Sequence, residues 1–334
     1  IFEKSYPADF IAEGVDQTRG WFYTLHAIAG MLFDSVAYKN VVANGLVLDA
    51  EGNKMSKRLG NAVDPVSTID KYGSDATRWY MVQNAQLWEN LKFDLNGLDE
   101  IRKKLFGTLH NVYSFYALYS NIDGFSYSEE KLPLEKRSEL DRWIISKLNT
   151  LILEVTELIE NYEPTKAGRL IQDFVLEHLS NWYIRLCRRR FWKGDYTEDK
   201  IAAYQTLSEI LYSISQLMSP FAPFYSDRLF LDLNEVMNLS KAESVHLSDW
   251  PKGDEKSINK ALESKMDLAQ EITSLTLSLR KKAGIKVRQP LEKVMVPAIT
   301  DIQEHEILEI TELLKGELNL KEVQVLRDTS GVFV

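Results

Sequence analysis

Length, composition and charge limit the classes of protein that this sequence can form. The chain has 334 residues, 45% of them hydrophobic, which is enough for two or three domains with buried cores. Its single cysteine, Cys187, excludes an internal disulfide framework and argues against a cysteine zinc site within the chain. No apolar run reaches the length of a membrane-spanning helix, so no membrane partner is expected.

Residues 1–96 are predicted to be mixed α/β. A helix is expected over 18–33, followed by a Val- and Leu-rich strand over 41–48. The turn residues 49–53 come next, so the segment after them lies at a strand end, where ligands bind in open α/β sheets. Asp64-Pro65 is typical of a helix start, and a further helix is expected over 74–86, after Gly73.

Residues 97–235 are predicted to form a helical bundle. Apolar residues recur at three- and four-residue steps over 140–159, which indicates a long amphipathic helix ended by Glu163-Pro164. Two more helices are expected over 166–191 and 198–218. The sequence Ser-Pro-Phe-Ala-Pro-Phe at 219–224 then ends the last helix and redirects the chain.

The remaining residues are predicted to form a linker over 236–254 and a small α/β domain over 255–334. Its first helix is expected over 256–283, with strands over 293–297 and 322–326 and a second helix over 301–315. The apolar stripe of the first helix is predicted to contain Leu262, Met266, Ala269, Ile272, Leu275 and Leu279.

A lysine-rich loop follows the predicted strand over 41–48. The segment 54–61 reads Lys-Met-Ser-Lys-Arg-Leu-Gly-Asn. Two ammonium groups on a loop bordered by Gly60 suit a polyphosphate, and Ser56 with the backbone amides can position phosphate oxygens. The alternative is a solvated charge run on the surface.

A second motif lies upstream, with carboxylates and an amide around a glycine. Residues 13–21 read Glu-Gly-Val-Asp-Gln-Thr-Arg-Gly-Trp, in which Gly14 permits close backbone approach. Glu13, Asp16 and Gln17 can accept hydrogen bonds from a ribose diol or an ammonium group. The alternative is a helix cap, with Asp16 or Thr18 starting the following helix.

Two basic patches are candidates for contact with RNA phosphates. A net charge of −9 is unfavourable for RNA binding, so local charge has to supply the attraction. Aromatic residues accompany the first patch and can stack on bases. The alternative is a solvated helix face. The candidate contacts are Trp182, Arg185, Arg188, Arg189 and Arg190 in the first patch, and Arg280, Lys281, Lys282 and Arg288 in the second.

The lysine loop resembles the KMSKS loop of class I aminoacyl-tRNA synthetases, with Arg58 in place of the last Ser. The two motifs in this order resemble the isoleucyl-tRNA synthetase family, and the resemblance covers nearly the whole chain. The nearest rival is the valyl-tRNA synthetase family, against which the string over 13–21 argues. A rival from another class is a tRNA-binding module without catalysis.

The resemblance implies a fold that is mostly α with α/β parts. Residues 1–96 resemble the second half of a class I Rossmann-like catalytic domain, 97–235 an anticodon-binding bundle, and 255–334 a truncated small carboxy-terminal domain. None of the five histidines has the spacing of a HIGH motif. A carboxy-terminal piece without that motif and without the editing domain, inactive alone, is therefore expected.

The implied activity is that of an isoleucine-tRNA ligase, which forms isoleucyl-AMP from isoleucine and ATP with Mg²⁺ and transfers isoleucine to tRNA(Ile). A monomeric, cytoplasmic protein is expected, and a zinc site elsewhere in a longer protein stays open. Gly60 and Asn61 are expected to act as hinges of the loop. The implied site residues are Lys57 and then Lys54 for catalysis; Met55, Ser56 and Arg58 in the ATP-phosphate loop; and Glu13, Gly14, Asp16, Gln17 and Gly45 around the adenylate.

Overall fold

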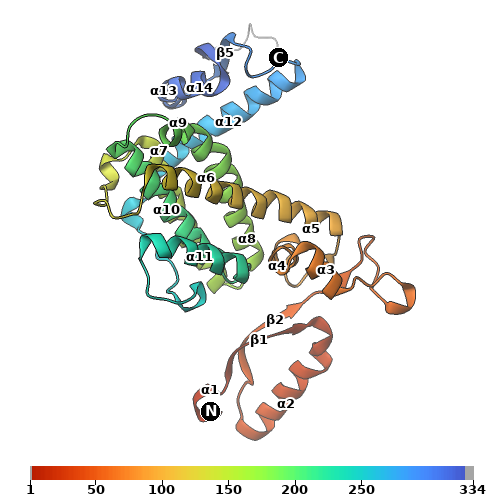
Figure 1. The fold of residues 1–334 in the computed structure, drawn as a ribbon. Coiled ribbons are helices and arrows are strands. Elements are labelled where there is room, and N and C mark those ends of the chain that lie inside the picture. The colour runs from red at the N-terminus through yellow and green to blue at the C-terminus, as the bar shows by residue number, and fades with distance from the viewer. Residues whose placement is uncertain (1, 328–334) are drawn as a thin grey trace. The chain divides into compact units, whose positions relative to one another are not determined.

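The computed structural model describes residues 2–327, and the chain divides into two compact units (Figure 1). Within the described residues, the first unit comprises 2–138 and 148–253, and the second comprises 139–147 and 254–327. Helices dominate, and the described residues also form two-stranded parallel sheets, which confirms a mostly α fold with α/β parts. Within this described part, no helix is long and apolar enough to cross a membrane.

The amino-terminal part of the first unit is a β-α-β arrangement. After the short helix α1 (Phe2–Ser5), strand β1 (Ala8–Gly14) pairs in parallel with β2 (Tyr38–Asn44), and α2 (Trp21–Phe33) connects them (Figure 1). The helix predicted over 18–33 starts later, because Val15–Arg19 is a 3₁₀ turn that ends at Gly20.

The strand predicted over 41–48 is interrupted at Gly45. Strand β2 ends before this residue, and β3 (Val47–Leu48) pairs instead with β4 (Leu91–Lys92). The Gly45 backbone N–H donates to the Leu87 carbonyl at 2.8 Å, and a Cβ on Gly45 would lie 2.1 Å from the Glu89 carbonyl oxygen. The interruption therefore follows from a backbone approach that only glycine permits.

Helices α3 (Pro65–Tyr72) and α4 (Ser74–Asn84) follow the lysine loop. As predicted, Asp64 caps α3 by accepting a hydrogen bond from the Ser67 backbone N–H at 2.8 Å, and Gly73 separates the two helices with a φ of 89°. Capping satisfies a donor that the first helical turn otherwise leaves without a partner.

Long helices follow from residue 95 onward, as the apolar periodicity predicts. They belong to the first unit, except for the residues Glu139–Lys147 at the start of one of them, which belong to the second. The proline at 164 starts α8, and α10 occupies the predicted range over 198–218. The run expected over 166–191 is helical throughout but has a π-helical middle, Phe174–Ile184. The α- and π-helices between residues 95 and 237 are α5 (Leu95–Ile101), the π-helical η3 (Arg102–Phe106), α6 (Gly107–Asp123), α7 (Glu139–Glu160), α8 (Pro164–Asp173), η5 (Phe174–Ile184), α9 (Arg185–Trp192), α10 (Glu198–Met218) and α11 (Pro223–Met237).

Helix α4 connects the loop region to the corner between α10 and α11. The Asp75 carboxylate accepts a hydrogen bond from the Tyr225 backbone N–H at 2.6 Å, in the first turn of α11. The Arg78 guanidinium donates to the carbonyls of Pro220 and Phe221, each at 3.1 Å. Burial raises the pKa of the Asp75 carboxyl, although the hydrogen bonds that it accepts from the backbone N–H groups at the start of α11 oppose the rise. The corner is thus held by one acid and one base from the same helix.

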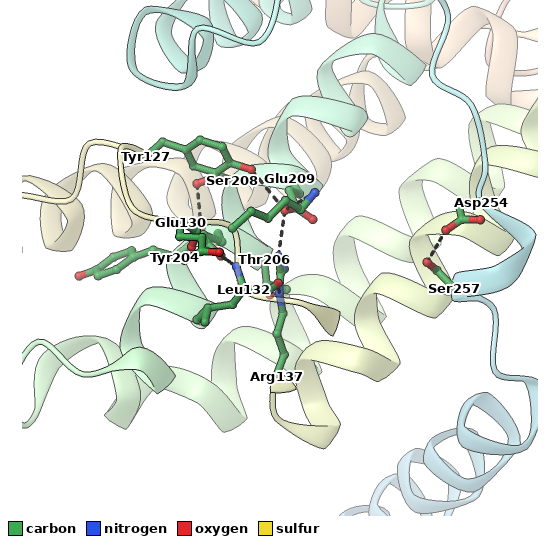
Figure 2. A network of polar contacts seen from close by, with 12 residues as sticks. Tyr127, Glu130, Leu132, Arg137, Tyr204, Thr206, Ser208, Glu209, Asp254 and Ser257 are labelled. Atoms are coloured by element: carbon green, nitrogen blue, oxygen red, sulfur yellow. Dashed lines mark hydrogen bonds and ion pairs between the residues drawn. The ribbon is translucent and has the colours of Figure 1, made fainter. Parts of the chain in front are cut away.

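The segment between α6 and α7 is fixed to α10 by a buried arginine (Figure 2). The Arg137 side chain is 2% exposed and donates to the Thr206 hydroxyl at 2.9 Å, the Leu132 carbonyl at 3.1 Å and the Glu209 carboxylate at 3.1 Å. Lys131, whose side chain is 67% exposed, also lies 3.1 Å from Glu209. Two cations of very different burial therefore share one carboxylate.

The second unit is built around helix α12 (Lys260–Lys282). Strands β5 (Leu291–Pro297) and β6 (Leu320–Leu326) pair in parallel, and α13 (Asp301–Glu309) and α14 (Thr311–Leu318) connect them. The single helix predicted over 301–315 is thus two helices, which meet at Ile310.

The apolar stripe predicted for α12 is correct in its first half and wrong in its second. Leu262, Met266, Ala269 and Ile272 are buried, but Leu275 and Leu279 are 60% and 61% exposed. Thr273, Thr276 and Arg280 are buried instead. The buried line moves around the helix after Ile272, and at its end the Arg280 guanidinium takes an interior position because backbone carbonyls accept its hydrogen bonds there.

Candidate functional site

The lysine loop begins on a turn that continues β3. Lys54 forms an isolated antiparallel bridge with Leu48, and Lys57–Leu59 form a 3₁₀ turn, η2. The Ser56 hydroxyl caps this turn by accepting from the Arg58 backbone N–H at 3.2 Å. Lys54, Lys57 and Arg58 are exposed, and no carboxylate among the described residues lies within ion-pair distance of them. Three cations are therefore available to a ligand on one short loop.

Met55 fixes the loop to the protein interior. Its side chain packs against the buried cluster of Tyr80, Leu91, Phe93 and Leu98. It also lines a mainly apolar cavity of about 490 Å³, together with Val47 and Val63. Because Met55 points inward, the charged side chains that flank it are left to solvent. This alternation separates the apolar anchor from the groups that can bind phosphate.

Asp49 is a functional candidate that the sequence analysis treated only as a turn residue. Its carboxylate accepts from the Asn61 side-chain amide at 2.8 Å and from the Asn53 backbone N–H at 2.6 Å. These hydrogen bonds, with that from Asn61 the largest contribution, lower the pKa of the carboxyl. The signal in the sequence was an Asp before and an Asn after the lysines, but their pairing is visible only in the folded loop.

The upstream motif sits at the carboxyl end of the β1–β2 sheet. Glu13 and Gly14 are in register with Ala43 and Asn44, directly before Gly45, so the structure brings three of the predicted adenylate residues together. Glu13 and Asp16 are exposed. A Cβ on Gly14 would lie 2.6 Å from the Asp16 carboxylate oxygen, so a larger residue here would require the Asp16 side chain to move.

Gln17 has a structural role that the sequence analysis assigned to other residues. Its side-chain oxygen accepts from the Trp21 backbone N–H at 3.0 Å, at the start of α2, and its amide nitrogen donates to Asp16 at 3.0 Å. The cap expected from Asp16 or Thr18 is therefore made by Gln17. Gly45 also has a structural role, because the close approach of the Glu89 backbone leaves no room for a side chain at this position.

The first basic patch is partly interior. Trp182 is 3% exposed, so it cannot stack on a base, and the Arg185 guanidinium lies 5.4 Å from the centre of its ring. Arg190 pairs with Asp199 at 2.8 Å. Arg188 and Arg189 are exposed. The prediction that Trp182 contacts RNA is therefore wrong. An aromatic side chain on a bundle helix stabilises the fold more when it is buried in the core than when it is exposed.

The second basic patch contains one arginine that is structural. Arg280 is 3% exposed, and its guanidinium donates to the backbone carbonyls of Lys286, Gln289, Leu318 and Asn319 at 3.2, 3.0, 2.7 and 3.4 Å. These contacts join the end of α12 to the following loop and to the end of α14. Arg280 is therefore not available to RNA, whereas Lys281, Lys282 and Arg288 are exposed.

We expect Arg280→Ala to lower the free energy of unfolding of the second unit by about 2–4 kcal/mol, because one buried and three partly buried carbonyls lose their donor. Hydrogen exchange of the β5 and β6 amides measures this locally. Lys281→Ala, at the adjacent exposed position, is the matched control and should change stability by less than about 0.5 kcal/mol. Equal effects of the two variants would contradict the structural role.

No group of three or more His, Cys, Asp or Glu side chains in the described part of the chain is arranged to hold a metal ion.

The sequence matches two family models. Residues 1–94 match the class I tRNA synthetases (I, L, M and V), and residues 141–296 match the anticodon-binding domain of tRNA ligase. Among solved structures, a methionyl-tRNA synthetase of Mycobacterium tuberculosis in complex with methionyl-adenylate has a TM-score of 0.58 and 20% identity, covering 73% of this chain and 48% of that one. A LeuRS of Agrobacterium radiobacter, solved as a ternary complex with tRNA, has a TM-score of 0.57 and 20% identity over 76% of this chain and 29% of that one.

The chain therefore belongs to the class I tRNA synthetases, and over its whole length it is homologous to isoleucine–tRNA ligases. The isoleucine–tRNA ligase of Cytophaga hutchinsonii is 57% identical over 100% of this chain. Those of Bacteroides fragilis and Thermus thermophilus are 58% and 44% identical, each over 98% of the chain. The chain spans 30%, 29% and 31% of the lengths of these three relatives.

Proposed function

We propose that this chain supplies the lysine loop and the tRNA-binding helices of an isoleucine–tRNA ligase. The observation that carries the proposal is identity of 57% to such an enzyme over the whole chain, including the region of the exposed loop lysines. The proposed reaction activates isoleucine with ATP and transfers it to tRNA(Ile). A monomeric enzyme acting in the cytoplasm, where protein synthesis takes place, is part of the same proposal.

In the first step, a carboxylate oxygen of isoleucine attacks the α-phosphorus of ATP. The bond from this phosphorus to the bridging oxygen breaks, and pyrophosphate leaves with the electron pair. Mg²⁺ enters with ATP as part of the substrate and shares the charge. Ammonium groups placed in advance at the leaving group stabilise the transition state more than the ground state. Lys57 has this role first and Lys54 second, and Arg58 can add a bidentate phosphate contact.

The adenylate is proposed to lie at the carboxyl end of the β1–β2 sheet. Glu13 and Asp16 are the exposed acceptors there for the ribose diol and the ammonium group of isoleucine. Gln17 is less available, since its side-chain oxygen is bonded to the start of α2. Gly45 lets the backbone after Asn44 lie against the backbone of Glu89, so its proposed role is to shape the carboxyl end of the sheet rather than to contact the adenylate. A terminal ribose hydroxyl of tRNA then attacks the adenylate carbonyl carbon. The bond from this carbon to the phosphate oxygen breaks, AMP leaves with the electron pair, and the hydroxyl proton passes to solvent.

A chimeric enzyme tests the proposal directly. This chain replaces the matching residues of the C. hutchinsonii isoleucine–tRNA ligase, and isoleucine-dependent ATP–pyrophosphate exchange and tRNA charging are measured. The expected result is exchange with isoleucine above that with valine. A folded chimera without isoleucine-dependent exchange would refute the proposal. The chain alone is expected to show no exchange, and exchange by the chain alone would refute the view that other parts of the enzyme are required.

The proposed tRNA contacts of the first unit are Arg185, Arg188 and Arg189. Removing Arg188 and Arg189 together should weaken binding of tRNA(Ile) to the chain and reduce the slope of log K against log salt by about 1–2, because each lost phosphate contact removes roughly one unit. Filter binding across a salt series measures the slope. Arg190→Ala is the matched control, since its guanidinium is paired with Asp199. An unchanged slope in the double variant would exclude this face.

A further inference from the structure

A set of hydrogen bonds closes the base of the lysine loop. The Asn61 side-chain amide donates to the Asp49 carboxylate at 2.8 Å and to the Lys54 carbonyl at 3.3 Å, and its oxygen accepts from the Ser56 backbone N–H at 2.8 Å. We call these two side chains, Asp49 and Asn61, the clamp. Asn61, the last residue of the segment 54–61, thus binds Lys54 and Ser56 within that segment and Asp49 before it.

The clamp has support from both sides. Asp49 is 8% exposed and also accepts from the backbone N–H of Asn53 at 2.6 Å, so the turn before the loop is tied to the same carboxylate. Lys54 bridges back to Leu48, and Met55 packs on the buried cluster. The first part of the loop is therefore held by backbone pairing, side-chain hydrogen bonds and apolar contact together.

The second part of the loop lacks comparable contacts. Leu59 is 72% exposed, and nothing lies within 4 Å of a Cβ built on Gly60, whose φ is 71°. The described contacts of Lys57–Leu59 are local ones around the Ser56 cap. The two lysines therefore differ, because Lys54 is on the held part and Lys57 is on the free turn.

We infer that Asp49 and Asn61 are positioning residues, which hold Lys54 in place and confine movement of the loop to Lys57–Gly60. The consequence for phosphate binding rests on the proposed function, whereas the restraint itself does not. The expectation that Asn61 is a hinge is replaced, since its side chain makes three contacts that a moving residue would have to break. Gly60 remains the residue with the backbone freedom for a hinge.

Trypsin measures the restraint in the chain itself, because the loop offers cleavage sites after Lys54, Lys57 and Arg58. Cleavage reports the population of the open segment when opening is fast. Asn61→Ala should raise the cleavage rate after Lys54 by about tenfold or more, since three hydrogen bonds are lost. Cleavage after Lys57 and Arg58 should change by less than about threefold, because those sites are already on the free turn. Equal increases at all three sites, or none, would overturn the inference.

A reciprocal exchange separates a specific pair from general loosening. Asn61→Asp removes the donor of the pair and brings two carboxylates together, whereas Asp49→Asn keeps an acceptor oxygen opposite the Asn61 amide and is the milder variant. The double variant restores one donor and one acceptor between the positions. Its cleavage rate after Lys54 should return at least halfway, on a logarithmic scale, toward that of the wild-type chain. A double variant cleaved after Lys54 as fast as Asn61→Asp would overturn the pairing.

Hydrogen exchange provides a measurement that needs no variant. The Ser56 amide is bonded to Asn61, whereas Arg58 is bonded only to the neighbouring Ser56 hydroxyl. The Ser56 amide of the wild-type chain should exchange at least tenfold more slowly than that of Arg58, after correction for intrinsic rates. Equal protection of the two amides would overturn the inference even if every variant failed to fold.

The functional consequence is tested in the chimera. Asn61→Ala should raise the KM for ATP in pyrophosphate exchange by about tenfold, because ATP then binds only the fraction of molecules with an ordered loop. The KM for isoleucine should stay within twofold. A general loss of folded enzyme would leave both KM values unchanged, so a rise in the KM for ATP alone identifies an effect on the loop. An unchanged KM for ATP would overturn the positioning role. An inactive wild-type chimera would refute the proposed function alone, since the proteolysis results stand without it.

Discussion

Lys57→Ala in the chimera is expected to slow isoleucine-dependent ATP–pyrophosphate exchange by about a hundredfold to a thousandfold. This is the usual loss when one preorganised group that stabilises developing charge is removed. Lys57 is on the exposed turn and has no carboxylate partner among the described residues, so its charge is available to pyrophosphate. The loss should appear in kcat, with the KM for isoleucine unchanged, because the contact strengthens in the transition state.

Lys71→Ala is the matched control for this prediction. Lys71 is an exposed lysine on α3, and its ammonium group lies 4.9 Å from the centre of the Tyr72 ring, outside the loop. Lys71→Ala removes one positive charge from the same unit as Lys57→Ala, so it measures the long-range effect of losing a positive charge on the exchange rate. Its rate should stay within about threefold of the unsubstituted chimera. An unchanged rate in Lys57→Ala would exclude the assignment of Lys57.

Arg137→Ala is expected to lower the free energy of unfolding of the first unit by about 3–5 kcal/mol. The variant leaves the Glu209 carboxylate, the Thr206 hydroxyl and the Leu132 carbonyl without their shared donor (Figure 2). The cost comes from the hydrogen bonds of a buried guanidinium to three acceptors, while Glu209 keeps its contacts with Lys131 and the Tyr127 hydroxyl. A urea titration should show the midpoint lowered by about 1 M or more.

Lys131→Ala is an internal control for the same carboxylate. Its ammonium group lies as close to Glu209 as that of Arg137, but it is exposed, so solvent screens the interaction. The expected loss is less than about 1 kcal/mol. A double-mutant cycle then shows how much of the Arg137 effect depends on Glu209. Similar losses for the two single variants would mean that burial does not decide the energy here.

Signals that act between neighbours in the sequence predicted the helices well. Asp64-Pro65 started α3, Gly73 separated it from α4, and Glu163-Pro164 separated α7 from α8. These residues act through their own backbone angles or through donors within one helical turn. The lysine loop was recognisable for the same reason, since its residues are contiguous.

Long-range packing decided which members of the basic patches are exposed. Trp182 and Arg189 belong to one predicted patch, yet the first is buried and the second is exposed. Arg280 and Lys281 are adjacent and basic, but Arg280 binds carbonyls up to 39 residues away. Periodicity places residues on a helix face without saying which other segment covers that face.

The sequence contained enough information for the class of protein, the order of its matched parts and the position of the lysine loop. Each of these depends on a contiguous motif or on local helix chemistry, which the chain carries wherever it packs. The folded structure was needed to pair Asp49 with Asn61, to assign the cap of α2 to Gln17 and to explain Gly45 by the backbone of Glu89. The Asp49–Asn61 and Gly45–Glu89 contacts join residues 12 and 44 positions apart. Such contacts depend on how the whole unit closes, and no local preference records them.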